Sequence, residues 1–166
     1  METLLFMVVI ILLSGLVIYL LYTLINSKNH IYSQMIDYLN DNIKNNLTNK
    51  YDTTYKIIEF LINNKILNDS DIEEFLNLNL KKDKTKEIHL ALLNTDKIIK
   101  DKLIDIRLKN NEEFLNLYET LKVSNKDLAS SINCYNRQIK EYNYLIKKNI
   151  FVLHKRYKKE LEPIKL

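Results

Sequence analysis

Glycine and proline, the residues that most often end helices and form tight turns, occur once each in this sequence of 166 residues. Gly15 lies inside an apolar run, and Pro163 lies close to the other end of the sequence. The long stretch between them therefore has no glycine for turns that require a positive φ. Such a stretch favours a few long helices over a β-sheet, and we predict an all-α fold.

An apolar run without a charged residue extends from Leu4 to Ile25. As a helix, these 22 residues span about 33 Å, enough to cross a hydrocarbon core of about 30 Å. A cleaved signal peptide is the main alternative, but no basic side chain precedes the run and no Ala-x-Ala site follows it. We therefore predict an uncleaved transmembrane anchor over residues 1–27, which contacts the lipid bilayer through Leu4–Ile25.

The charges around this run predict a single-pass orientation. Only Glu2 and the terminal amine precede the run, whereas Lys28 and further basic residues follow it. Because basic residues are retained on the cytoplasmic side, we expect the N-terminus outside and the remainder in the cytoplasm.

Residues 28–166 are predicted to form one helical bundle domain with a basic C-terminal end. Over its first part, apolar side chains recur every three or four residues, the spacing of one buried helical stripe. The members of this stripe are Ile31, Met35, Leu39, Ile43, Leu47, Tyr51, Tyr55, Ile58 and Ile62. No Ser/Gly linker separates the stripe from the apolar run, so one helix can continue through both.

Two further helices are expected after this stripe. Ser70 and Glu73 fit a capping box for a helix over residues 71–109. The segment Lys81–Glu87 interrupts the apolar stripe of this helix, so a kink or break is possible there. Asn110 and Asn111 then precede a final helix with a strict heptad. Its members are Phe114, Tyr118, Leu121, Asn125, Leu128, Ile132, Tyr135, Ile139, Tyr142, Ile146, Asn149 and Leu153. We predict an antiparallel bundle of three long helices with coiled-coil-like packing, whose longer last helix extends beyond the other two.

Two Tyr-Asn pairs stand out in the final helix, Tyr135-Asn136 and Tyr142-Asn143. The two tyrosines lie seven residues apart and therefore on one stripe, with each asparagine beside it. Core packing of the rings is the simpler interpretation. The alternative is that Tyr135, Asn136, Tyr142 and Asn143 form a surface that binds a partner.

These pairs resemble the paired Tyr-Asn motif in the final helix of the LemA family. Asn111–Leu117 is similar to the segment that opens the same helix in that family, and Lys50-Tyr51-Asp52 with Lys56-Ile57-Ile58 resembles a segment of its first soluble helix. The family also has the same order of parts: a short N-terminus, one membrane helix and then long antiparallel helices. The chain departs from the family pattern at Tyr55, in place of a proline, and at Ile132, in place of an arginine. It also lacks the Phe-Pro that follows the last motif. The resemblance implies a bacterial membrane protein and supplies no catalytic residues.

Residues for catalysis, metal binding or cofactor binding do not cluster in the sequence. None of the three histidines, His30, His89 and His154, has a second histidine or a cysteine within one turn. Cys134 is the single cysteine and has no nearby histidine. A phosphate-binding loop requires glycines that the chain lacks. We therefore expect no enzyme activity, no metal and no cofactor.

The last 20 residues, Lys147–Leu166, carry seven Lys/Arg and two Glu, a net charge of +5. A solvated helix end is the simpler interpretation of this basic segment. We predict a membrane-tethered LemA-like scaffold or interaction module that binds an unknown protein or associates with itself. Binding of nucleic acid or an acidic surface through the basic segment is the alternative.

Overall fold

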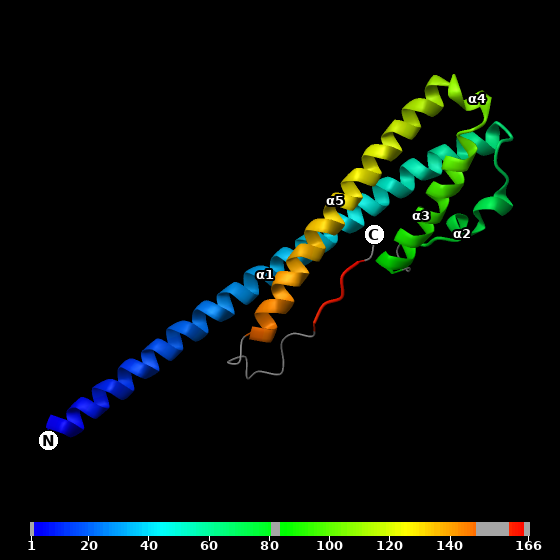
Figure 1. The fold of residues 1–166 in the computed structure, drawn as a ribbon. Coiled ribbons are helices and arrows are strands. Elements are labelled where there is room, and N and C mark those ends of the chain that lie inside the picture. Colours follow the sequence, from blue (N-terminus) through cyan, green and yellow to red (C-terminus); the bar gives the residue numbers. More distant parts are fainter. Residues whose placement is uncertain (1, 81–83, 149–159, 165–166) are drawn as a thin grey trace. The chain divides into compact units, whose positions relative to one another are not determined.

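The computed structural model describes residues 2–80, 84–148 and 160–164. The regular elements in these ranges are all helical, and no strand occurs among them, so the all-α prediction is confirmed (Figure 1). The elements are α1 (Glu2–Asn63), the 3-10 helix η1 (Asp69–Ile72), α2 (Glu73–Leu76), α3 (Thr85–Lys102), α4 (Ile106–Lys109) and α5 (Glu112–Lys148).

The apolar run and the stripe that follows it belong to one helix, α1, without a break at residue 27. No glycine or proline occurs between residues 16 and 63, so nothing in the sequence interrupts its hydrogen bonds. The apolar side chains from Leu5 to Leu24 are largely exposed. Among the described residues, α1 is the one helix long and apolar enough to cross a membrane, judged by length and composition.

Helix α1 ends with a reversal at Lys65, the one described residue other than glycine with a positive φ, at 55°. The amide N–H of Ile66 donates to the carbonyl of Leu61, and that of Lys65 donates to the carbonyl of Ile62, both at 2.9 Å. The first of these bonds, in a chain turning through a left-handed residue, is typical of a Schellman cap. The chain thus turns without the glycine that this position usually requires.

The helix predicted over residues 71–109 is not continuous, because this part of the chain forms η1, α2, α3 and α4. Helix α3 begins at Thr85, inside the segment Lys81–Glu87 where the sequence made a break possible. Asn77 and Asn79, which have low helix propensity, lie where α2 ends. Glu87 then caps α3 by accepting a bond of 3.1 Å from the amide of Lys84. The first cap also differs from the prediction: Asp71 accepts from the amide of Asn68, two residues earlier than the predicted Ser70–Glu73 box.

Helix α5 begins where the sequence predicts. The side-chain oxygen of Asn111 accepts a bond of 2.9 Å from the amide of Phe114, so Asn111 caps the helix. Every described member of the predicted heptad is buried or half-buried, from Phe114 to Ile146. Asn149, Leu153, His154 and most of the predicted basic segment lie outside the described residues.

The stripe predicted on α1 needs correction. Ile31, Met35 and Tyr55 are exposed, at 59%, 45% and 48%. Among the described side chains of this helix, the buried ones are Asn29, Ile36, Leu39, Ile43, Leu47, Lys50, Thr54, Ile57, Ile58 and Leu61. Three polar residues, Asn29, Lys50 and Thr54, therefore occupy positions of the buried face.

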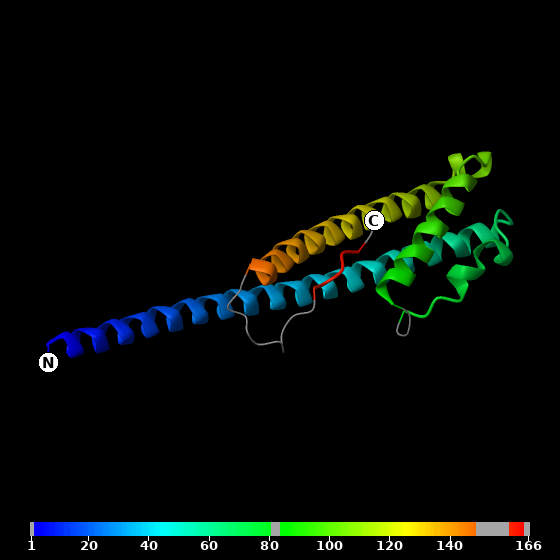
Figure 2. The same ribbon diagram turned by 60° about the horizontal axis from the view of Figure 1, so that its bottom comes forward.

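The chain divides into two compact units. The first unit combines residues 1–38 with 135–163, and the second combines 39–134 with 164–166. In the first unit, Ile36 of α1 packs with Ile139 and Tyr142 of α5. In the second, α3 lies against the C-terminal half of α1 (Figure 2). Both Phe75 and Phe114 are fully buried in this unit.

Candidate functional site

The four residues of the Tyr-Asn pairs all lie on the part of α5 that belongs to the first unit. Tyr142 is only 6% exposed and packs with Ile36 and Ile139, and Tyr135 is half-buried against the same cluster. Burial raises the pKa of both tyrosines, and the nearby Asp37 carboxylate adds to the increase. Both hydroxyls thus stay protonated, which suits packing and hydrogen bonding better than proton transfer.

Asn143 binds the backbone of a segment that follows α5 in the sequence. Its Nδ2 donates to the carbonyl of Leu161 at 2.9 Å, and its Oδ1 accepts from the amide of Leu161 at 3.1 Å. A side-chain amide that pairs with both backbone groups of one residue requires that residue to be extended, as in β-strand addition. Asn136, the other asparagine of the motif, is half-buried on the same helix.

Two further contacts surround this pairing. The Leu161 side chain packs against the cluster of Ile36, Ile139 and Tyr142. One turn beyond Asn143, Lys147 Nζ lies 3.3 Å from Glu160 Oε2, and both side chains are more than half exposed. We call the residues that contact Glu160 and Leu161 the docking surface: Ile36, Ile139, Tyr142, Asn143 and Lys147.

The sequence did not indicate that Leu161 is the residue that Asn143 binds. Leu161 lies 18 residues from Asn143 and outside the heptad, so periodicity could not relate the two. The only local signal was the pattern Glu160-Leu161-Glu162-Pro163, in which the proline disfavours continuation of a helix.

A second polar site lies inside the second unit. Lys50 Nζ of α1 lies 2.7 Å from Asp96 Oδ2 of α3, and the two side chains are 1% and 9% exposed. Thr54, one turn along α1 from Lys50, is fully buried. His89 of α3 is also buried, with 5% of its surface exposed. Lys50 was predicted only as part of the family resemblance. Leu47, Lys50 and Thr54 follow one another at intervals of three and four residues, and this helical spacing is the signal that Lys50 belongs to the buried face.

His89 is held neutral by this environment. Neither of its ring nitrogens has a hydrogen-bond partner among the described residues. Burial lowers its pKa below the ordinary value of 6.5, the Lys50 ammonium lowers it further, and the Asp96 carboxylate opposes both effects.

This shift predicts a stability that depends on pH. Because the unfolded chain takes up the His89 proton more readily than the folded chain, stability falls as pH drops below about 6.5. His89→Gln should reduce the loss in the free energy of unfolding between about pH 7.5 and pH 5.5, measured by urea titration followed by circular dichroism. His30→Gln, at an exposed position of α1, is the matched control and should leave the loss unchanged. An identical pH dependence in the His89 variant and the wild type contradicts the assignment.

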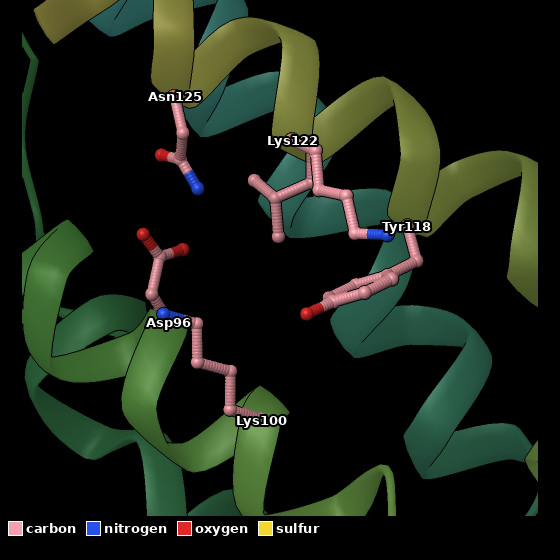
Figure 3. Close-up of a pocket in the computed structure, with 6 residues that line it drawn as sticks. Asp96, Lys100, Tyr118, Lys122 and Asn125 are labelled. Atoms are coloured by element: carbon pink, nitrogen blue, oxygen red, sulfur yellow. The ribbon is translucent and has the colours of Figure 1, made fainter.

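Beside this polar site is a pocket of about 300 Å³ between α3 and α5. Figure 3 shows Asp96 and Lys100 projecting from α3, and Tyr118, Lys122 and Asn125 from α5. The Nζ atom of Lys122 lies 2.6 Å from Glu119 Oε1 and 4.8 Å from the centre of the Tyr118 ring. The hydrogen bond to Glu119 raises the pKa of Lys122, which favours the charged amine over the neutral form that a nucleophile requires.

The remaining candidates for chemistry are separated in the structure. His30 is exposed, His89 is buried and Cys134 is half-buried on α5. Within the described ranges, no three His, Cys, Asp or Glu side chains come together in a group that could hold a metal ion.

Comparisons of the chain with protein-family models, curated proteins and solved structures find no match. The features that bear on its class are therefore its own: an all-helical fold, one N-terminal helix apolar enough for a membrane, and a docking surface occupied by an extended segment of the same chain.

Proposed function

We propose that this chain is a membrane-tethered helical scaffold of the LemA type, which binds other proteins and has no catalytic activity. The observation that carries the proposal is the pairing of Asn143 with both backbone groups of Leu161. A surface that recognises backbone in this way is suited to binding polypeptide. The resemblance of the Tyr-Asn pairs to the LemA motif points to the same residues.

The proposed architecture is a bilayer anchor followed by an antiparallel helical bundle. Inside the second unit, Asn46 of α1 donates to Ser131 of α5 at 2.8 Å, whereas the ring of Phe60 lies 5.7 Å from that of Phe114. Later residues of α1 thus meet earlier residues of α5, which supports an antiparallel pair. Leu4–Ile25 would anchor the chain, with the N-terminus outside and the remainder in the cytoplasm.

A crosslinking experiment in native membranes tests the proposed function. A photoreactive amino acid placed at Tyr144, which is 56% exposed beside Asn143, should crosslink a protein, either another species or a second copy of the chain. The same probe at Val123, 58% exposed in the second unit, is the positional control. We expect a product that is specific to position 144 and is reduced by Asn143→Ala.

Crosslinking to lipid alone, or equal products from both positions, would contradict the scaffold proposal. Capture of nucleic acid that is sensitive to salt and lost on deletion of Lys147–Leu166 would favour the basic-segment alternative instead.

A further inference from the structure

We infer that the docking surface is a peptide-binding site for an extended segment in which an acidic residue precedes a leucine, and that the chain's own Glu160 and Leu161 occupy this site as a displaceable ligand. The inference rests on the proposed function and adds to it the chemistry of the partner and a means of regulation. The partner is a second protein that presents such a segment.

Three contacts define what the site selects. Asn143 binds the backbone of any extended residue, because its bonds at 2.9 and 3.1 Å reach only the amide and the carbonyl of Leu161. The leucine side chain packs against the cluster of Ile36, Ile139 and Tyr142. A smaller side chain would leave part of this apolar surface uncovered. Lys147, at 3.3 Å from Glu160, favours an acidic residue immediately before the leucine.

The spacing of these groups suits a short extended segment. Ile139, Asn143 and Lys147 follow one another at four-residue intervals on α5, so they lie along one side of the helix. Lys147 and Asn143 contact consecutive residues of the bound segment, Glu160 and Leu161. The bound segment therefore has one orientation on α5, in which its acidic residue lies toward the C-terminal end of the helix.

The contacts made by Glu160 and Leu161 are few enough to be exchanged. With the described residues, they comprise two hydrogen bonds, one exposed ion pair and one half-buried leucine, while Glu162 and Pro163 are exposed. An exposed ion pair contributes little to stability. The advantage of this segment over an external one is that it belongs to the same chain, which raises its effective concentration.

The test uses the full chain in detergent micelles and a fluorescent pentapeptide with the sequence of residues 160–164, Glu-Leu-Glu-Pro-Ile. In the wild type, the resident segment should compete with the probe. In Leu161→Asp, which introduces a charge against the apolar cluster, the site is vacated. Fluorescence anisotropy should then show peptide affinity at least about tenfold higher for Leu161→Asp than for the wild type. A chain that ends at residue 159 should behave as Leu161→Asp does.

Two controls assign the binding to the docking surface. Added to Leu161→Asp, Asn143→Ala should weaken peptide binding at least about tenfold, since both backbone bonds are lost. Asn133→Ala, the same substitution at an exposed position of α5, should leave binding unchanged. A probe with alanine in place of its leucine should bind weakly to every variant.

Equal peptide binding by the wild type and both vacated chains, or no binding by any of them, overturns the inference. Peptide binding that is unchanged when Asn143→Ala is added to Leu161→Asp also overturns the inference. These results leave the proposed function standing if crosslinking at Tyr144 still captures a protein. Conversely, peptide binding by the vacated chains without any captured protein supports the inference and contradicts the proposed function.

Discussion

Lys50→Met is expected to lower the free energy of unfolding by about 3–5 kcal/mol, the largest effect of any single substitution considered for this chain. Lys50 and Asp96 form an ion pair at 2.7 Å with side chains only 1% and 9% exposed. Methionine keeps most of the lysine volume, so the loss arises chiefly from the Asp96 carboxylate, which is left buried without its counter-charge. Urea titration followed by circular dichroism measures the change.

Two further variants separate the ion pair from its surroundings. The double variant Lys50→Met with Asp96→Leu removes both charges and should recover most of the lost stability, because apolar residues often replace a buried ion pair without loss. Lys44→Met is the matched control on the same helix, since its partner Asp41 lies 3.3 Å away with both side chains more than half exposed. The control should change stability by no more than about 0.5 kcal/mol. If Lys50→Met and Lys44→Met have the same unfolding midpoint, the buried pair does not stabilise the fold.

Tyr142→Ala should cost about 3 kcal/mol, through the loss of ring burial and the cavity left beside Ile36 and Ile139. Tyr142→Phe keeps the ring and should cost much less, so the difference between the two variants reports the hydroxyl contribution. The measurement is the thermal unfolding midpoint of the full chain in detergent.

Tyr144→Ala is the matched control for this prediction. Tyr144 is also a tyrosine of α5, but it is 56% exposed, so its removal leaves no cavity. An unfolding curve that Tyr142→Ala leaves unaltered would show that the ring is not part of the core. The tyrosine would then act only at the docking surface.

Periodicity predicted the long elements well because their burial follows the helical repeat. The heptad of α5 matches the observed burial from Phe114 to Ile146, and Asn111 caps the helix as its residue type predicts. Helix α1 ends at Asn63, directly after Ile62, the last member of its predicted stripe. These features depend on neighbours three or four residues away, which a sequence displays directly.

The errors arose where partners lie far apart in the sequence. Tyr51 and Tyr55 were chosen for the buried stripe because they are apolar, but Lys50 and Thr54 occupy the buried face. Asp96, 46 residues away, neutralises the charge of Lys50, and hydrophobicity along one helix cannot reveal such a partner. The docking surface was found only in part for the same reason. Tyr142 and Asn143 were identified as candidates, but the segment they contact could not be.

The unbroken hydrogen bonding of α1 has a mechanical consequence. Ile25, the last residue of the apolar run, and Ile36 of the docking surface lie 11 positions apart on the same helix, which corresponds to about three turns and about 16 Å. If Leu4–Ile25 crosses a bilayer as proposed, torque on it from a change in bilayer thickness or tension meets no glycine or proline hinge between Ile25 and Ile36. The Ile36 side chain, which packs with Leu161, would then rotate with the helix, and the proposed anchor would couple the lipid environment to the retention of the chain's own segment.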